Sequence, residues 1–183
     1  MRRIINSTYI SLDGVVEQPH EWPTIDRPSD ERGGQIQASL LMACDAVLMG
    51  RRTYDGFAPV WQTRSGDPVS DRMNTMPKYV VSTTLRYPDW ANTTVISGDV
   101  AEQIRDLKAR SGQDIVQYGF GAVSTLLMEQ GLLDELRLWF HPLFVGTGTS
   151  DDLLFPKASP TQFELTDSTI LENGMAILTY RLA

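Results

Sequence analysis

Residues 45–57, DAVLMGRRTYDGF, decide the fold. Four apolar residues follow the leading aspartate and Gly50 comes next, which predicts a short buried strand that ends at this glycine. Residues 53–57 then predict the opening of a short helix. A buried strand that passes quickly into a helix is typical of an α/β fold with a parallel sheet.

The same alternation continues on both sides of this stretch. Strand-like runs occupy 4–10, 78–82, 93–97, 114–118 and 135–145, and helical periodicity covers 30–44, 99–112 and 122–130. Two last strands, 163–171 and 175–182, are joined by Glu172-Asn173-Gly174, a strong hairpin signal. Residues 17–34 and 58–77 carry several prolines and are expected to be loops. We therefore predict a mostly parallel sheet with an antiparallel C-terminal edge.

Composition limits the classes of protein that the chain can be. It has 183 residues, a net charge of −7 and 42% hydrophobic residues, so we expect one globular domain over 1–183. A pI near 4.8 argues against generic nucleic-acid binding. One cysteine and two histidines argue against a disulfide, a cysteine-based zinc site and any dedicated metal site. The sequence has no signal peptide and no long apolar run, so we expect a soluble, cytoplasmic protein without a membrane partner.

Glycine and hydroxyl side chains follow three of the predicted strands. Ligands of open α/β sheets bind at the carboxyl ends of the strands, where backbone N–H groups at helix starts attract anions. Arginines beside them can add charge-assisted contacts to phosphate. The segments are Gly50-Arg51-Arg52-Thr53, Ser82-Thr83-Thr84 and Gly119-Phe120-Gly121. Together they predict a pocket for a polyphosphate or a dinucleotide.

Simpler interpretations stay open for each of these segments. A glycine after a strand is usually only a turn, and adjacent arginines are usually a solvated surface. Gly119-Phe120-Gly121 is followed by Ser124 where the dinucleotide pattern requires its third glycine, and no Gly-Lys-Ser/Thr loop exists. The sequence therefore argues against an ordinary Rossmann or P-loop site. Cys44 is interpreted as a core residue and His141 as a structural one.

In their order and spacing, four segments are similar to those of a known family. They are SLDG at 11–14, DAVLMGRRTY at 45–54, KYVVSTTL at 78–85, and the block that runs from Gly119 to Gly148. The chain resembles the dihydrofolate reductase-like family, in the branch related to the reductase domain of bifunctional riboflavin-biosynthesis (deaminase-reductase) proteins, and the resemblance covers residues 4–156. This resemblance implies a three-layer α/β/α domain that binds NADPH across the strand ends and forms a homodimer.

The resemblance also implies roles for individual residues. Gly50, Arg51, Arg52 and Thr53 would contact the diphosphate and the 2′-phosphate of NADPH. Ser82, Thr83 and Thr84 would lie beside the phosphate of the adenosine ribose, and Gly119 and Gly121 beside the diphosphate and the nicotinamide half. Phe120 is larger than the residue usual in relatives, so it either narrows the nicotinamide site or points into the core. Thr149-Ser150-Asp151-Asp152 is acidic where relatives are commonly basic.

The implied activity is hydride transfer from NADPH to a flat nitrogen heterocycle. The substrate would be a 5-amino-6-(5-phosphoribosylamino)uracil-type pyrimidine, or a pterin such as dihydrofolate. Such a reaction needs a proton donor, for which Asp30 and Glu31 are the candidates at the start of a helix, with Glu21 and Asp26 in the loop before it. Trp22 and Trp61 are candidates for a wall against the heterocycle. Each of these residues could instead serve as a cap, a surface charge or core packing. The alternative function is a non-catalytic module that binds a nucleotide or a small ligand.

Overall fold

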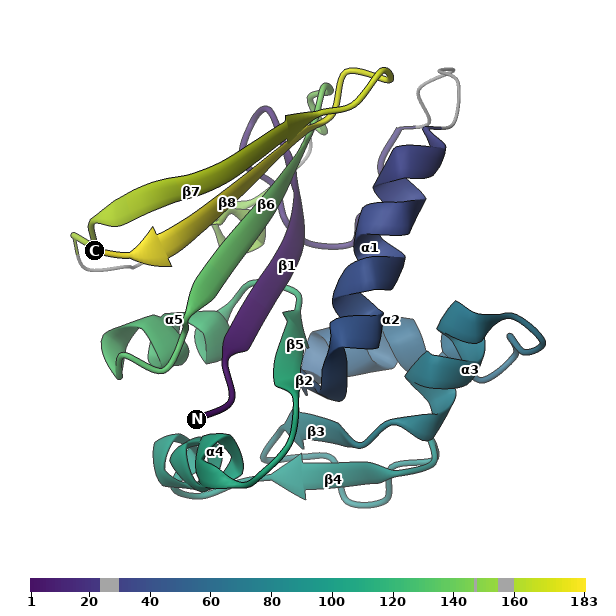
Figure 1. The fold of residues 1–183 in the computed structure, drawn as a ribbon, viewed down its shortest axis with the longest axis vertical. Helices are drawn as coiled ribbons and strands as arrows, with labels where there is room; N and C mark the ends of the chain where they lie inside the picture. Colours follow the sequence, from purple (N-terminus) through teal and green to yellow (C-terminus); the bar gives the residue numbers. More distant parts are fainter. Residues whose placement is uncertain (24–29, 147, 155–159) are drawn as a thin grey trace.

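The computed structural model describes residues 1–23, 30–146, 148–154 and 160–183. These residues form one eight-stranded sheet in the order β4-β3-β2-β5-β1-β6-β8-β7 (Figure 1). The strands are β1 (Ile4–Ser11), β2 (Cys44–Gly50), β3 (Lys78–Val81), β4 (Thr93–Ile96), β5 (Asp114–Tyr118), β6 (Glu135–His141), β7 (Phe163–Ile170) and β8 (Ala176–Leu182). The helices are α1 (Glu31–Ala43), α2 (Arg51–Trp61), α3 (Pro68–Thr75), α4 (Val100–Ala109) and α5 (Ala122–Glu129), with a short 3-10 turn at Ser150–Asp152.

The sheet has a parallel part and an antiparallel edge, as the sequence predicts. Strands β4, β3, β2, β5, β1 and β6 pair in parallel, with Val47 opposite Val116 and Ile4 opposite Ile115. Strand β8 pairs antiparallel with β6, and the C-terminal hairpin adds β7 as the edge strand. The predicted hairpin between β7 and β8 is therefore confirmed.

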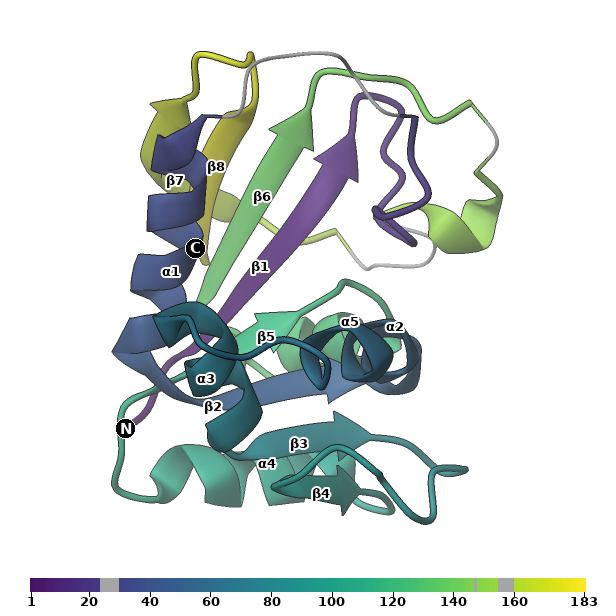
Figure 2. The ribbon, with the colours of Figure 1, turned by 90° about the vertical axis from the view of Figure 1, so that its right-hand side faces the viewer.

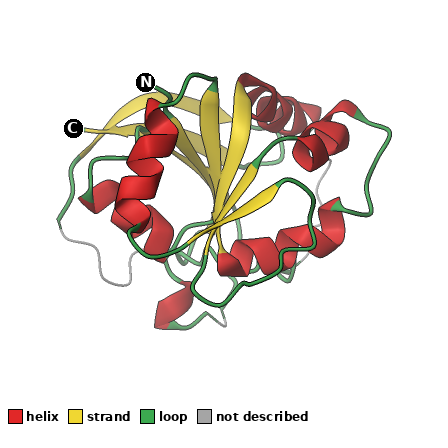
Figure 3. Ribbon diagram, turned by 90° about the horizontal axis from the view of Figure 1, so that it is seen from below, coloured by secondary structure: helices red, strands yellow, loops and turns green. Residues whose placement is uncertain are grey.

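Helices cover both faces of this sheet, which confirms the three-layer α/β/α architecture (Figure 3). On one face, Leu41 of α1, Ala58 of α2 and Met73 of α3 pack in one buried cluster with the inner strands. On the other face, Ile104 of α4 and Leu127 of α5 pack in a second cluster. Neighbouring strand residues belong to different clusters because side chains alternate between the two faces of a strand. Among the described helices, none has both the length and the apolar character to cross a bilayer.

The loop predicted over 58–77 is wrong in its greater part. Helix α2 begins at Arg51, two residues before the predicted opening, and continues to Trp61 although it contains Pro59. Helix α3 begins at Pro68, with the Asp67 carboxylate accepting the N–H groups of Val69 and Ser70. Proline is well tolerated in the first turn of a helix, where its missing N–H has no partner to lose. Pro68 was therefore wrongly interpreted as a loop signal, whereas Pro59 lies inside α2, within three residues of its end.

Strand β6 is shorter than predicted and ends at His141 instead of continuing to residue 145. Pro142 follows directly and has no N–H to donate, so it cannot continue a paired strand. The chain then turns back, and the N–H of Leu143 donates to the carbonyl of His141 at 2.8 Å.

Candidate functional site

Strands β2 and β5 mark the point where the order of the sheet reverses. From β2 the chain moves outward to β3 and β4, and it returns to form β5 between β2 and β1. The helices that follow these two neighbours lie on opposite faces, α2 beside α1 and α3, and α5 beside α4. Figure 2 shows the arrowheads of β2 and β5 pointing toward the end of the sheet where α2 and α5 lie. Crevices of this kind are the usual ligand sites of open α/β sheets.

The helices on either side of this crevice begin differently from the other three. At the starts of α1, α3 and α4, an aspartate carboxylate accepts a backbone N–H: Asp30 from Arg32, Asp67 from Val69 and Ser70, and Asp99 from Glu102. Helices α2 and α5 begin at Gly50 and Gly121, which have no side chain to form such a bond. Their first N–H groups are therefore open to an anionic ligand, and the helix dipole favours negative charge there.

A close contact joins the starts of α2 and α5. Gly119 has a φ of +77°, and a Cβ atom at this position would overlap the hydroxyl oxygen of Thr53. Only glycine combines that backbone conformation with so close an approach. Thr53 and Gly119, predicted from separate segments, are therefore neighbours in the structure.

A buried polar network holds the Gly119 carbonyl in place. This carbonyl accepts N–H bonds from Asn6 at 2.9 Å and from Gln117 at 2.8 Å, and the Ser124 hydroxyl lies 3.3 Å away. The Gln117 amide also donates to the Ser124 hydroxyl at 2.9 Å. Since all three side chains are buried, the network fixes the turn between β5 and α5. The serine that breaks the dinucleotide pattern thus supports the turn.

Both predicted arginines lie at the start of α2 and carry exposed guanidinium groups. Arg51 pairs with Asp55 one turn along the helix, with Nε 2.8 Å from the carboxylate. Arg52 lies 3.9 Å from the carboxylate of Glu17, which belongs to the loop after β1. The Arg51–Asp55 pair is exposed and therefore weak, and the Arg52–Glu17 pair is long at 3.9 Å, so a phosphate group could replace either carboxylate. The positive charge is therefore available beside the two open helix starts.

The segment Ser82-Thr83-Thr84, which follows β3, has one buried residue and two exposed ones. Ser82 is buried, and its hydroxyl oxygen accepts the N–H groups of Thr84 and Leu85 at 3.2 and 3.0 Å. Thr83 and Thr84 are exposed. Because β3 lies beside β2, these threonines are at the same edge of the sheet as Gly50. The contribution of all three residues to cofactor binding stays a prediction.

Phe120 belongs to the core. Its side chain is 5% exposed and lies in the buried cluster on the α4 and α5 face, which includes Ile10 and Leu127. Of the two interpretations of this residue, the structure therefore supports the one in which the ring points into the core.

Asp30 serves as a structural link at the start of α1. One carboxylate oxygen accepts the N–H of Arg32 at 2.9 Å, and the other accepts the N–H of Glu172 in the β7–β8 turn at 2.7 Å. Glu31 and Glu21 are exposed, and Asp26 lies outside the described residues. The proposed proton-donor role of Asp30 and Glu31 stays a prediction, while the cap role of Asp30 is visible.

The structure places Trp22 and Trp61 in different surroundings. The indole N–H of Trp22 donates to the Glu17 carbonyl at 2.9 Å, and its ring packs edge-on against His141 with centroids 5.4 Å apart. Trp61 ends α2, about 15 Å along the helix axis from its start. It contacts Phe57 and lies under the guanidinium of Arg64. Each tryptophan therefore contacts different residues, and these contacts do not join the two rings into one wall.

An aromatic lining that sequence reasoning missed lies on the α1 face of the sheet. Tyr9 and His141 have ring centroids 4.7 Å apart, and Phe57 and Tyr118 have centroids 5.5 Å apart. Burial raises the pKa of both tyrosines and lowers the pKa of His141. In the sequence, the alternation along β1 indicates only that Ser7, Tyr9 and Ser11 share one face of the strand. It does not show which strands are neighbours, so the contact between Tyr9 and His141 could not be predicted.

Glu17 is a second residue that the sequence did not single out. Its side chain is 23% exposed, and burial raises its pKa, although Arg52 opposes this effect. A carboxyl group with a raised pKa at the mouth of a crevice is a candidate acid. The shift follows from burial in the folded loop, so the sequence carried no sign of it.

Asp13 joins the loops that follow β1 and β6. Its carboxylate accepts the Ser11 hydroxyl at 2.6 Å and the N–H groups of Gly146 and Val145 at 2.9 and 3.1 Å. These bonds lower the pKa of Asp13 to about 2. The SLDG segment therefore acts as a clamp between two strand ends.

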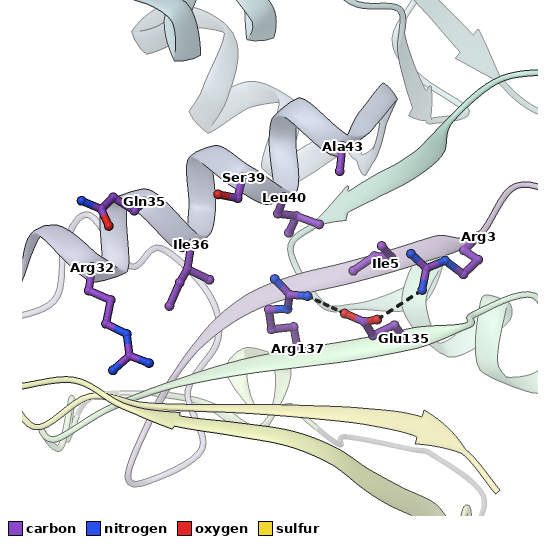
Figure 4. A pocket seen from close by; sticks show the side chains of 10 residues that line it. All are labelled: Arg3, Ile5, Arg32, Gln35, Ile36, Ser39, Leu40, Ala43, Glu135 and Arg137. Atoms are coloured by element: carbon purple, nitrogen blue, oxygen red, sulfur yellow. Dashed lines mark hydrogen bonds and ion pairs between the residues drawn. The ribbon is translucent and has the colours of Figure 1, made fainter.

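A separate pocket of about 500 Å³ runs along α1 toward the starts of β1 and β6 (Figure 4). Arg137 donates to Glu135 at 2.7 Å, and Arg3 pairs with Asp114 and approaches Glu135 at 3.8 Å. Its charges are thus mostly paired. Because it opens at the amino ends of the strands, it lies away from the crevice between α2 and α5. No cluster of potential metal ligands occurs among the residues that the structure describes.

Comparisons with known proteins agree with this fold. A protein from Bacillus subtilis (strain 168), the uncharacterized protein YyaP, is 29% identical over 155 residues, which cover 80% of this chain and 78% of YyaP. A candidate riboflavin biosynthesis protein from Shewanella sp. PV-4 has a TM-score of 0.71 and 22% identity, covering 100% of this chain and 99% of its own.

A third relative is larger than this chain. The diaminohydroxyphosphoribosylaminopyrimidine deaminase/5-amino-6-(5-phosphoribosylamino)uracil reductase of Thermotoga maritima has a TM-score of 0.68 and 14% identity, covering all of this chain and 57% of its own. The family model described as the RibD C-terminal domain matches residues 2–177. The chain therefore belongs to the RibD C-terminal domain family.

Proposed function

We propose that this protein is an NADPH-dependent reductase of a flat nitrogen heterocycle. The observation that carries the proposal is the meeting of two uncapped helix starts at the contact between Thr53 and Gly119, with Arg51 and Arg52 beside them. Three other helices have aspartate caps, so the open starts are a local feature of this crevice.

The residues of the crevice fit a dinucleotide phosphate. The first N–H groups of α2 and α5 would bind the diphosphate, and Gly119 gives the backbone room to approach it. Arg51 or Arg52 would bind the 2′-phosphate that distinguishes NADPH from NADH, with Thr83 and Thr84 as hydroxyl donors. Bound NADPH supplies the hydride, and the protein contributes binding and orientation.

The substrate would lie on the α1 face of the sheet. Tyr9, His141 and Trp22 form an aromatic surface at the ends of β1 and β6, and Tyr118 continues it on β5. Such a surface suits a flat ring. The uracil reductase named for the Thermotoga maritima relative supports a pyrimidine as the first substrate to test. Glu17 joins Asp30 and Glu31 as a candidate proton donor because its carboxyl group is partly buried.

A specific observation favours the second candidate, a binding module without turnover. Both carboxylate oxygens of Asp30, the N-cap residue of α1, are engaged by backbone N–H groups. If no other acid serves, the site would bind its ligands without reducing them.

Spectrophotometry of NADPH oxidation tests the proposal. Purified protein is mixed with NADPH and either 5-amino-6-(5-phosphoribosylamino)uracil or dihydrofolate, and absorbance at the nicotinamide band is followed. We expect oxidation that depends on one of these substrates. NADPH binding without oxidation in either mixture would support the binding module, and the absence of NADPH binding would refute the reductase and leave only a module for another ligand. Sedimentation in the same buffer tests the expected homodimer.

A further inference from the structure

We propose that Gln37 and His141 are specificity-determining residues that bind the polar edge of the heterocycle. The inference rests on the proposed function because it assigns residues to the substrate half of that site. Neither side chain was a candidate for substrate binding from the sequence.

Three elements bring these residues together. Tyr9 lies near the end of β1, and His141 is the last residue of β6, where it pairs with Ser11. Gln37 lies in the second turn of α1, on the same face of the sheet. Its side chain lies near the Tyr9 hydroxyl and lowers the pKa of Tyr9, against the larger effect of burial, which raises it. A strand, a neighbouring strand and a helix thus converge at the carboxyl end of the sheet.

Two polar atoms in this group lack partners. Gln37 Oε1 and His141 Nε2 are buried and accept or donate no hydrogen bond among the described residues. Nearby on the same face, the buried indole N–H of Trp139 donates to the Ser7 hydroxyl at 3.1 Å. Buried polar atoms are normally paired, so two unpaired ones at a candidate site indicate a missing partner. That partner is either a ligand or a bound water molecule.

The aromatic rings around these atoms favour a flat ligand. The His141 ring lies 4.7 Å from Tyr9 and 5.4 Å from Trp22, measured between centroids. A ring beside them would present its edge to Gln37 and His141 after a small rotation of either side chain. Burial lowers the pKa of His141, so the imidazole is neutral at neutral pH and has one accepting nitrogen. Gln37 Oε1 also accepts. The matching ligand edge is uncharged and carries N–H donors.

The first experiment measures ligand binding without cofactor. The probe is 5,6-diaminouracil, a flat ring with N–H donors, titrated by calorimetry into the wild type, Gln37→Leu and His141→Phe. Leucine keeps most of the glutamine volume, and phenylalanine keeps a ring against Tyr9 and Trp22. We expect each substitution to weaken binding about tenfold or more, equal to about 1.4 kcal/mol. The matched control is Gln35→Leu, an exposed position on the same helix, which leaves binding unchanged.

Two further measurements separate this inference from the proposed function. Melting temperatures show whether each variant is folded, and an NADPH titration shows whether the cofactor half is intact. With a substrate that supports turnover, Gln37→Leu should raise KM more than it lowers kcat, because it removes binding and leaves hydride transfer in place. A conservative Gln37→Asn variant would recover part of the affinity only if the amide itself binds the probe.

The outcomes are distinct. If the probe binds equally to the wild type, Gln37→Leu and His141→Phe, or does not bind the wild type at millimolar concentration, the inference is wrong and water is the missing partner. NADPH oxidation could still occur in that case, and the proposed function would stand. If the probe binds through Gln37 but NADPH does not bind, the proposed function fails and the ligand subsite remains.

Discussion

The five described helices divide into two groups by how they begin, and the comparison separates stability from function. Helices α1, α3 and α4 start at aspartates whose carboxylates bind the first N–H groups. Helices α2 and α5 start at Gly50 and Gly121 and leave these groups open. A side-chain cap stabilises a protein by about 1 kcal/mol. The fold forgoes this contribution only where two helices meet at the crevice, which is expected if a ligand supplies the negative charge.

The largest expected effect comes from giving α5 the cap that the first group has. Position 121 has extended backbone, and a Cβ atom there meets nothing within 4 Å. Gly121→Asp should therefore keep or raise the melting temperature. It should weaken NADPH binding by roughly a thousandfold, or about 4 kcal/mol, because the carboxylate occupies the N–H groups and repels the diphosphate.

Gly121→Ala is the matched control, since it adds the Cβ atom without the charge and should bind NADPH within a few-fold of the wild type. Fluorescence titration gives both affinities. Wild-type affinity in Gly121→Asp would show that the start of α5 binds no phosphate.

The next effect concerns the arginines at the other open start. We predict that NADPH binds more tightly than NADH by about 2–3 kcal/mol, since one charge-assisted contact to the 2′-phosphate contributes about 1.5–3 kcal/mol. The double variant Arg51→Ala/Arg52→Ala should lose this preference while NADH affinity changes little. Arg110→Ala, at the end of α4, is the control for net charge. Equal affinities in the wild type, or a preference retained by the double variant, would contradict the assignment.

The contact between the two open helices can be broken from one side. Gly119→Ala places a methyl group against Thr53 and forces a non-glycine residue into a positive φ. We expect the free energy of unfolding to fall by about 1–3 kcal/mol, as measured by urea denaturation. Adding Thr53→Ala should recover part of the loss by removing the overlap. A double variant no more stable than Gly119→Ala would show that backbone strain, not the contact, is the whole cause.

A smaller effect is expected where a cap is removed. Asp99→Ala leaves the N–H of Glu102 without its partner at the start of α4, which should cost about 1 kcal/mol and lower the melting temperature by about 2–4 °C. NADPH affinity should not change, because α4 lies away from the crevice. Calorimetry and the same titration check both statements. A loss of NADPH affinity would mean that the two groups of helices are not independent.

The smallest effect is a pH dependence at the Asp13 clamp. The folded pKa of about 2 lies below the ordinary value of 3.8, so the unfolded chain binds more protons in this range. The contribution of Asp13 to the free energy of unfolding is therefore present above about pH 4 and is lost as the pH falls toward 2. Asp13→Asn should show a weaker fall in stability over this window than the wild type. Urea denaturation at several pH values measures the free energy of unfolding of both proteins. If the two curves of free energy against pH are parallel, the Asp13 hydrogen bonds do not cause the pH dependence.

Local sequence determined most of the fold because each strand and helix carried its own pattern. Val47 and Leu48 mark a buried strand wherever it lies in the sheet, and the hairpin at residues 172–174 needs no distant contact. Helix α3 was missed because Pro68, next to the Asp67 cap, reads locally like a loop. The strand order could not be derived from periodicity, since pairing of β5 between β2 and β1 depends on packing over the whole chain.

The candidate site was predictable only in its glycine and arginine segments. Gly50 and Gly119 stand beside strands, so their place at the sheet edge follows from the sequence. The raised pKa of Glu17 arises from burial in the folded chain. The network of Asn6, Gln117 and Ser124 joins segments that are more than a hundred residues apart. Gln37 gave no signal because its unpaired oxygen exists only after α1 has packed on β1.

The Asn6–Gln117–Ser124 network also divides the crevice into parts that can be altered separately. It anchors the turn at Gly119 from inside the sheet, through side chains of β1, β5 and α5. The aromatic surface, by contrast, comes from the ends of β1 and β6 and from Trp22. A redesign could therefore replace the outer surface residues while the turn at Gly119 keeps its shape, so the two parts of the crevice can be varied independently.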